Sequence, residues 1–415
     1  AYRMIAGAIA VLGLMLAPFL DLLIKNPGNV GNVHIYYFIY LFNTVTSYLV
    51  SYKYSLVNAE QKNYIYTNVN LLISSSTIIL QIITIVIWKN FLVYLSVTAI
   101  FGIFQKIFIS IYFNRLYPYL KEKNTEKLTK EEKHLLISKI KALILHKIGD
   151  VSVHQTDNII VSAFVSTKMV GLLSNYNLII NTVSSCINVL FNSVIGSLGN
   201  MAAMESKDYQ YKVFKKYRFI GFWFYGFTSI ALAILMTPFI TIWIGKKMIV
   251  DVLVINLLVI DYYMIGQRIC LNNIKSAAGV YEPDKYVALL QAAVNLISSV
   301  ILAKIIGLPG VFVGTILQGM LSSILKPILS YKMLFGISSK FYFIDSAKYA
   351  GAVIGAYVIC YILSKLIIAD ITIVNFAVLA ICVVIIPNVM FGFLFYKTEE
   401  FQYYYNMLKS IALKK

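Results

Sequence analysis

The sequence predicts an all-α, polytopic membrane protein with about twelve transmembrane helices. The chain has 415 residues, of which 59% are hydrophobic and only 13% are charged. An average soluble domain is roughly 45–50% apolar and about 25% charged, so this composition cannot cover a soluble fold with polar surface. The apolar residues also gather in runs of about 20, the length of a helix that crosses the hydrocarbon core. These runs lack the alternation that is typical of membrane β-strands.

Twelve runs have this length, and short polar segments separate most of them. No run carries a large loop domain beside it, so each is expected to form one membrane helix followed by a turn. In chain order, the predicted spans are 4–24, 35–57, 64–88, 91–113, 143–165, 170–198, 217–244, 252–272, 286–306, 311–334, 347–368 and 371–396.

One long basic segment divides the spans into unequal groups. We predict a four-helix N-terminal lobe (1–116), a basic linker (117–142) and a six-helix C-terminal lobe (143–340). Two additional helices (341–397) and an interfacial tail (398–415) complete the expected organisation. The second half of the linker fits either an amphipathic helix on the membrane surface or a solvated connector.

The positive charges predict the orientation of the chain in the membrane. If both termini are cytoplasmic, 28 of the 36 Lys and Arg residues lie on the inside and seven on the outside. Basic residues favour the cytoplasmic side of membrane proteins, so this distribution supports the orientation. The net charge of +18 then reflects loops that face anionic lipid, and it does not indicate a nucleic-acid partner.

The sequence shows no motif of a soluble enzyme and no expected cofactor. It contains no Walker loop, no HExxH, no nucleophile elbow and no GxGxxG after a strand. The four cysteines have no metal-binding spacing. Energy for any transport is therefore expected from an ion gradient rather than from a nucleotide bound to this chain.

The predicted span 143–165 is the richest in ionisable residues. His146, Asp150, His154 and Asp157 are spaced so that all four share one face of a helix. Alternating imidazole and carboxylate groups within a membrane suit a proton relay or a cation-coupled switch. The alternative is a set of paired polar groups that fasten helices together. We assign Asp157, His154 and Asp150 to ion coupling.

A second charged pair lies in the predicted span 252–272. Asp261 and Arg268 are seven residues apart on one helix face, about 10 Å along the axis, which is too far for direct pairing. Asp261 joins the candidates for ion coupling. Arg268 is a candidate for binding an anion, or alternatively extends to the inner interface. Tyr262, beside Asp261, is a candidate for substrate binding.

Other polar residues are candidates for substrate binding. Lys106 lies deep within the predicted span 91–113, where a loop position cannot explain its charge. Lys53 is shallower and can also extend to the interface. Asn175 belongs to a run of Asn and Ser residues that either line a wet path or hold helices together.

Several short motifs together resemble a known family over residues 1–396. The sequence is similar to the polysaccharide flippases of the multidrug/oligosaccharidyl-lipid/polysaccharide exporter superfamily. Leu173 stands where the family often has Tyr. The motifs are TDNII at 156–160, VGLLSNY at 170–176, PFITIWIG at 238–245, GVY at 279–281 with DKY at 284–286, NLIS at 295–298 and GLPGVFVGT at 307–315.

The resemblance implies two six-helix lobes followed by two extra helices, so the first two helices of the family are expected to be missing here. It also implies the cargo: an undecaprenyl-pyrophosphate-linked oligosaccharide, moved from the inner to the outer leaflet of a bacterial plasma membrane for capsule or exopolysaccharide synthesis. The coupling cation would be H⁺ or Na⁺, and polymerase and glycosyltransferases of the pathway would be partners. Cations in a central chamber between the lobes, with Lys106 and Arg268 as candidates, would offset the pyrophosphate charge.

Two other functions remain open. A small-molecule efflux antiporter of the same superfamily would use Asp157 and Asp261 for cationic drugs, but Lys106 and Arg268 disfavour it. A membrane polysaccharide polymerase would need a large outer loop, and every predicted outer loop is short.

Overall fold

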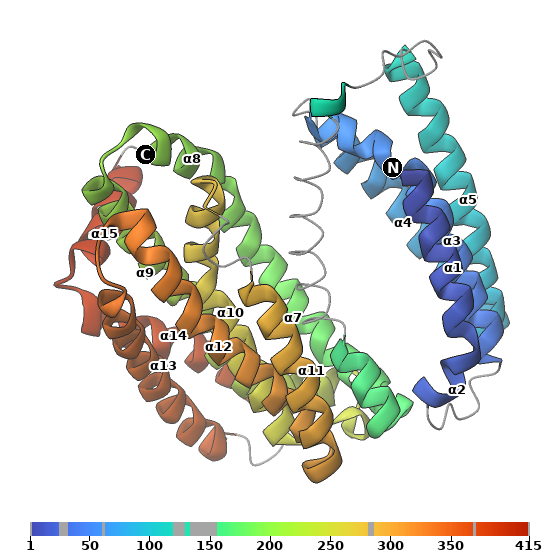
Figure 1. Cartoon of the computed structure of the whole chain (residues 1–415). Helices are drawn as coiled ribbons and strands as arrows, with labels where there is room; N and C mark the ends of the chain where they lie inside the picture. Colours follow the sequence, from blue (N-terminus) through green and yellow to red (C-terminus); the bar gives the residue numbers. More distant parts are fainter. Residues whose placement is uncertain are drawn as a thin grey trace. The chain divides into compact units, whose positions relative to one another are not determined.

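The structure is a computed structural model, and it describes residues 2–24, 32–59, 63–118, 129–132, 156–280, 286–367 and 371–413. Within these ranges the regular elements are all helices, which confirms the predicted all-α class (Figure 1). Nine helices among the described residues are long and apolar enough to cross a membrane. The chain is therefore a polytopic helical membrane protein.

The chain forms two compact units, residues 1–134 (unit 1) and 135–415 (unit 2). In unit 1, α3 packs against α1, α4 and α5, and α4 also contacts α5. The domain boundaries expected from the sequence stay predictions. The elements of unit 1 are α1 (Tyr2–Leu16), a 3-10 turn (Ala17–Phe19), α2 (Leu20–Leu23), α3 (Val33–Ala59), α4 (Asn63–Trp88) and α5 (Phe91–Leu116).

Unit 2 begins, in its described part, with the helical segment 156–164. Helix α10 packs on α9 and on α12, α11 packs on α12, and α13 and α14 pack on α9. The labelled elements are α7 (Thr167–Ser193), α8 (Ile195–Met204), α9 (Lys207–Trp243), a 3-10 turn (Lys246–Met248), α10 (Val252–Ala277), α11 (Val287–Ile306), α12 (Leu308–Phe335), α13 (Lys340–Ile367), α14 (Ile373–Phe395) and α15 (Glu399–Leu413).

Most predicted spans overlap one of these helices, although α9 and α13 begin before the predicted spans 217–244 and 347–368, and the predicted span 170–198 crosses the break between α7 and α8. Three other spans differ more. The first predicted span is a shorter apolar helix, Ile5–Phe19, that runs into the turn at Pro18. The second is α3, which has the length of a span but is made less apolar by its Asn, Thr and Ser residues. Of the predicted span 143–165, only the part from residue 156 lies within the described residues.

Local sequence explains where many of these helices begin. Asn90, Ser166, Ser206, Asp251 and Thr372 each precede a helix, and each side chain accepts a hydrogen bond from a backbone N–H of the first turn. Such caps satisfy amide groups that have no partner within the helix, and each contributes about 1 kcal/mol.

The hairpin of α11 and α12 depends on glycine. Gly307 joins the two helices with φ of +67°, a conformation that side chains disfavour. Beyond the turn, a Cβ at Gly310 would lie 2.1 Å from the Leu302 carbonyl oxygen, and one at Gly314 would lie 2.2 Å from Ser299 Oγ. Small residues therefore let the two backbones approach closely, as is common between membrane helices.

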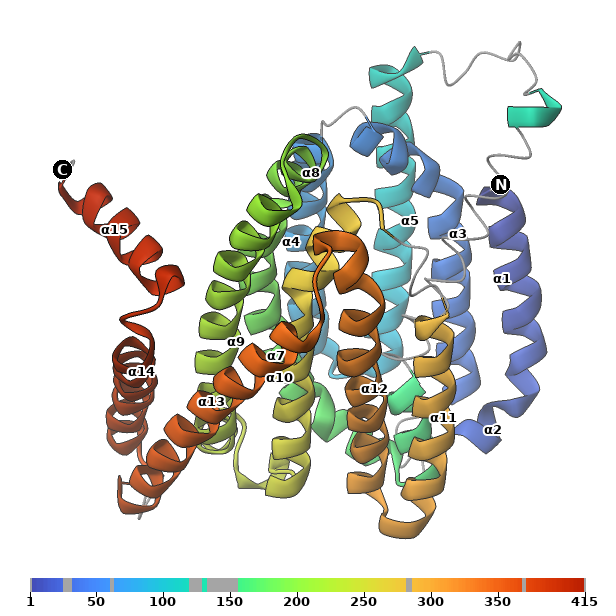
Figure 2. The same cartoon turned by 60° about the vertical axis from the view of Figure 1, so that its left-hand side comes forward.

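Helix α9 is the centre of unit 2. One side packs into the core shared with α7, α10 and α12, and the other side packs against α13 and α14. On that second side, the Phe222 ring stacks on Tyr349 with centroids 4.2 Å apart and also meets Phe391. Figure 2 shows α13 and α14 beside α9, with α15 following α14.

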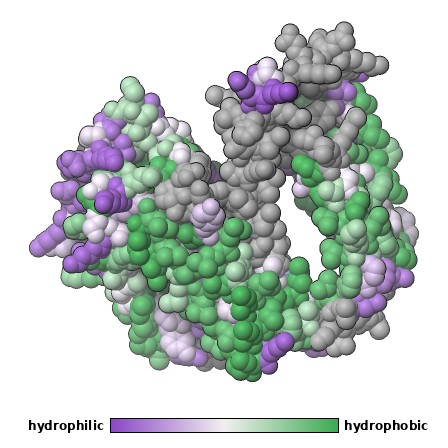
Figure 3. Space-filling model, in the orientation of Figure 1, coloured by the Kyte–Doolittle hydropathy of each residue, from purple (hydrophilic) through white to green (hydrophobic). Residues whose placement is uncertain are grey.

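The surface of unit 2 is divided by polarity. In Figure 3, apolar side chains cover α11 and α12, whereas polar side chains gather over α15 and the adjacent end of α9. A broad apolar face beside a polar end fits a helical bundle that sits in a bilayer.

Candidate functional site

Unit 1 holds a lysine between helices α3 and α5. Lys106 on α5 donates hydrogen bonds to the Asn43 carbonyl oxygen (2.9 Å), to Asn43 Oδ1 and to Thr46 Oγ1 (2.8 Å), all on α3. An ammonium group has three N–H donors, so these three acceptors satisfy it. Every one of these acceptors is uncharged, so no carboxylate offsets the Lys106 ammonium at these contacts.

A second lysine joins the same two helices in the opposite direction. Lys53 on α3 is 3% exposed and donates to Ser110 Oγ (2.7 Å), to the Ser110 carbonyl oxygen (3.1 Å) and to Asn114 Oδ1 (2.8 Å) on α5. Thus α3 donates hydrogen bonds to α5 through Lys53, and α5 donates hydrogen bonds to α3 through Lys106. The Lys53 side chain lies inside the bundle instead of extending along it to the interface.

A polar cavity of about 330 Å³ lies beside Lys106. Gln105 on α5 and Thr77 on α4 line it together with hydroxyl groups of α3. This volume falls in the range of small-ligand sites, roughly 300–1,000 Å³. A cavity that combines a lysine with hydroxyl and amide groups is chemically suited to a phosphate-bearing ligand. The lining residues are Asn43, Thr44, Ser47, Val50, Ser51, Thr77, Thr98, Gly102, Gln105, Lys106 and Ile109.

Unit 2 holds Asp157 in a network of oxygen and amide groups. Its carboxylate accepts a hydrogen bond from Thr315 Oγ1 (2.8 Å) and a longer one from Asn295 Nδ2 (3.5 Å). Asn295 Oδ1 in turn accepts from Thr156 Oγ1 at 3.0 Å, and Asn295 is fully buried. The network joins the segment 156–164 to α11 and α12. One carboxylate surrounded by neutral oxygens can hold a proton or a small hard cation.

Asp261 and Arg268 face one another across Gly319 of α12. A Cβ at Gly319 would lie 3.6 Å from Asp261 Oδ1 and 3.7 Å from Arg268 Nη1. Arg268 is 6% exposed and donates to the Gly319 carbonyl oxygen and to Ser323 Oγ (3.3 Å). Asp261 Oδ1 is buried and has no hydrogen-bond partner among the described residues. Glycine thus lets two opposite charges converge on one point of α12.

The two groups of charges belong to one cluster. Thr315, which donates a hydrogen bond to Asp157, precedes Gly319 by about one turn of α12, so Asp157 and the pair of Asp261 and Arg268 lie against neighbouring turns of the same helix. If all three groups are ionised, the cluster carries two negative charges and one positive charge. A net charge of about −1 in a low-dielectric bundle favours the uptake of one cation.

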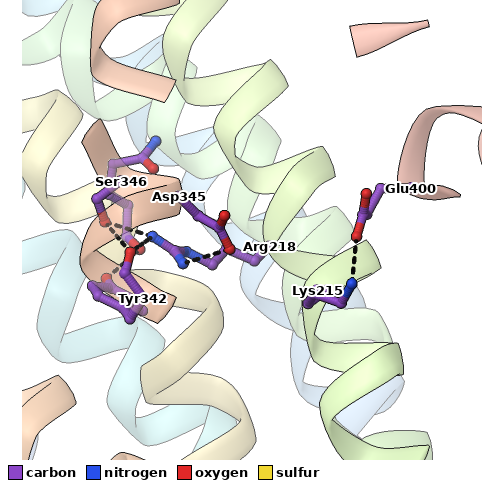
Figure 4. A network of polar contacts seen from close by, with 7 residues as sticks. Lys215, Arg218, Tyr342, Asp345, Ser346 and Glu400 are labelled. Carbon is purple, nitrogen blue, oxygen red and sulfur yellow. Dashed lines mark hydrogen bonds and ion pairs between the residues drawn. The ribbon is translucent and has the colours of Figure 1, made fainter. Parts of the chain in front are cut away.

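A further buried cation, Arg218 on α9, was not among the residues that the sequence singled out. It is 3% exposed, its guanidinium lies 3.7 Å from the Tyr342 ring centroid, and it donates to Ser346 Oγ and the Tyr342 carbonyl oxygen. Asp345 lies 3.8 Å away, so α9 and α13 are joined by a charged pair and by stacking (Figure 4). Arg218 lies at the start of the predicted span 217–244, where its charge was counted only toward the cytoplasmic side, but α9 already begins at Lys207.

A neighbouring contact attaches the C-terminal helix to α9. Lys215 pairs with Glu400 of α15 at 3.1 Å (Figure 4). Tyr404 Oη donates to the Lys216 carbonyl oxygen at 3.1 Å, and the Phe401 ring packs against Trp223. The predicted tail is thus a helix that docks on the bundle.

The other predicted site residues have different surroundings. Tyr262 is buried between α9 and α10, where its hydroxyl group contacts Thr228 Oγ1 at 2.7 Å. Asn175 donates to carbonyl oxygens of its own helix, α7. His154 and Asp150 lie outside the described residues. The structure groups Asp157, Asp261 and Arg268 within unit 2, whereas Lys106 and Lys53 belong to unit 1.

The partners of these residues could not be found from sequence spacing. Asn295 and Thr315 lie 138 and 158 residues from Asp157, and the sequence marked them only as parts of family-like motifs. Among the described residues, no three His, Cys, Asp or Glu side chains gather as a metal site would require.

Comparison with known proteins gives a fold likeness. No protein-family model matches the sequence, and no curated protein matches it. The chain is similar in structure to the lipid II flippase MurJ in an inward closed conformation, with a TM-score of 0.70 over 95% of this chain and 83% of that one. The two share 13% sequence identity. The chain has a MurJ-like fold. At this identity the likeness shows the fold alone.

Proposed function

We propose that the chain is a flippase of the multidrug/oligosaccharidyl-lipid/polysaccharide exporter superfamily. It would move undecaprenyl-pyrophosphate-linked oligosaccharide repeat units from the inner to the outer leaflet of a bacterial plasma membrane by ion-coupled alternating access. The product would supply capsule or exopolysaccharide synthesis, with polymerase and glycosyltransferases as partners in the pathway. Both termini would be cytoplasmic.

The observation that carries this proposal is the MurJ-like fold over 95% of the chain. A fold can host several functions, so the cargo must be argued from the site. Lys106 supplies that argument, because its hydrogen-bond acceptors among the described residues are all uncharged. A partly buried positive charge without a carboxylate among these partners suits an anionic cargo such as a pyrophosphate, which cannot cross hydrocarbon without compensation.

The cluster around Asp157 supports ion coupling. Arg268 offsets the charge of Asp261 and leaves the Asp157 carboxylate as the excess negative charge. One monovalent cation, H⁺ or Na⁺, would balance the cluster. His154 and Asp150 remain part of this proposal as further members of the same helix face.

The charges in unit 1 separate this proposal from its rivals. A drug-efflux antiporter for cationic compounds would gain nothing from the Lys106 cavity, because like charges repel. A polymerase would act on the outer surface, and the described segments between spans are short turns. Neither of these two functions explains why a polar cavity lies beside Lys106 within a candidate membrane span.

Flipping in proteoliposomes tests the proposal. Reconstituted protein would be given an undecaprenyl-pyrophosphate-linked oligosaccharide, and its transfer between leaflets would be followed with an impermeant reagent. We expect Lys106→Gln to reduce the initial rate strongly and Lys106→Arg to restore part of it. Lys304→Gln, at the exposed end of α11, is the matched control and should transport as the wild type does. Equal rates for Lys106→Gln and the control, in protein of equal thermal stability, would contradict the proposal.

A further inference from the structure

A second, apolar groove lies on unit 1 beside the Lys106 cavity. Helix α4 contributes Leu72 and Ser76, and α5 contributes Phe104 and Phe108, each from one face of its helix. The groove has a volume of about 510 Å³ and its wall is mainly aromatic and aliphatic. Leu72 is 69% exposed, so side chains of unit 1 leave the groove open. Both helices are candidate membrane spans, which places the groove at the depth of the lipid chains.

The groove and the polar cavity meet at one residue. Gln105 lines both, because it lies on α5 between Phe104 of the groove and Lys106 of the cavity. A ligand that joins a phosphate group directly to an apolar chain could therefore occupy both at once. The apolar chain of the ligand would lie among the aromatic rings of the groove, while its phosphate group would lie beside the Lys106 ammonium.

The depth of this junction distinguishes between possible occupants. Lys106 lies ten residues before the end of α5, about 15 Å along the axis, which is near the middle of a hydrocarbon core of about 30 Å. The phosphate of an ordinary bilayer lipid stays at the interface and does not reach this depth. A lipid-linked pyrophosphate in transit between leaflets has to pass it.

We propose that the α4–α5 groove binds the first isoprene units of the polyprenyl chain while the Lys106 cavity holds the attached pyrophosphate. This inference rests on the proposed function and assigns it a chain-binding site within unit 1. Because the bilayer is as apolar as the groove, selectivity must come from packing contacts rather than from the hydrophobic effect. The aromatic wall of Phe101, Phe104, Phe108 and Tyr112 provides such contacts.

Photolabelling tests the groove directly. The full chain would be placed in phosphatidylglycerol nanodiscs and labelled with a farnesyl pyrophosphate analogue that carries benzophenone at its chain end. We expect label on α4 and α5 peptides, displaced by undecaprenyl pyrophosphate and not by added phosphatidylglycerol. Ser76→Trp places an indole ring in the groove and should lower this label about tenfold, since the ring occupies the volume that the isoprene units would fill.

Ser74→Trp is the matched control, because Ser74 is an exposed serine on the same helix that does not line the groove. Equal label in the two tryptophan variants, or displacement by phosphatidylglycerol, would overturn the inference and show an ordinary lipid contact. Inorganic pyrophosphate binding gives the separate readout for the head group. If Lys106→Gln binds inorganic pyrophosphate as well as the wild type does, this contradicts the proposed role of the Lys106 cavity, independently of the photolabelling result.

Discussion

The two units keep their buried charges in different ways. In unit 1, Lys106 lies beside a cavity and donates only to neutral oxygen atoms, with no carboxylate among these partners. In unit 2, Arg268 converges with Asp261 on Gly319, and Arg218 lies beside Asp345. Charges with opposite partners hold helices together or switch with a bound cation, whereas a charge among neutral groups is available to an anion. Under the proposed function, unit 1 binds the anion and unit 2 couples transport to a cation.

The largest loss of stability is expected where unit 2 loses the balance between the charges of Arg268 and Asp261. Arg268→Gln leaves the Asp261 carboxylate without its opposing charge, and we expect a loss of roughly 3–5 kcal/mol of stability. The double variant Arg268→Gln with Asp261→Asn should recover much of this loss. Thermal unfolding in detergent measures both. Additive losses in the double variant would show that the two charges do not compensate one another.

Asp157→Asn is expected to act on coupling more than on folding. The amide keeps the shape of the carboxylate and its contact with Thr315 but removes the charge that a cation would balance. The dependence of flipping on an imposed ion gradient should fall by roughly 5- to 150-fold. Asn158→Ala, at an exposed neighbouring position, should leave it intact. An unchanged gradient dependence in Asp157→Asn would remove unit 2 from ion coupling.

Arg218→Lys tests whether the α9–α13 contact depends on a planar cation. Lysine keeps the charge near Asp345 but cannot stack on Tyr342 while donating to Ser346, so we expect a loss of about 0.5–2 kcal/mol in stability. Thermal unfolding again gives the measurement. A melting temperature equal to that of the wild type would show that charge alone joins these helices.

The smallest effect is expected at the docked C-terminal helix. The pair of Lys215 and Glu400 is partly exposed, so Lys215→Gln should cost at most about 1 kcal/mol. Its signature is local: amide exchange in α15 should become faster while exchange in α9 does not change. Faster exchange throughout α9 would mean that this contact supports the core of unit 2.

Most of the long helices were predictable from sequence because each contains a long apolar run, and five of them start after a capping Asn, Ser, Asp or Thr. The beginning of α9 was not predictable, since its basic residues at 207–218 are typical of a loop. Only tertiary packing places Arg218 between aromatic rings. Spacing correctly placed Asp261 and Arg268 on one helix face. It could not show that Gly319, on another helix, is where they converge, because partners distant in sequence leave no periodic signal.

The affinity of the protein for inorganic pyrophosphate tests the central contrast most directly. It would be measured for the wild type, Lys106→Gln and Asp157→Asn under one set of salt conditions. The account predicts that Lys106→Gln binds pyrophosphate far more weakly than the wild type, whereas Asp157→Asn binds it about equally well. Wild-type affinity in Lys106→Gln, or a loss in Asp157→Asn as large as that in Lys106→Gln, would contradict the assignment of anion binding to unit 1.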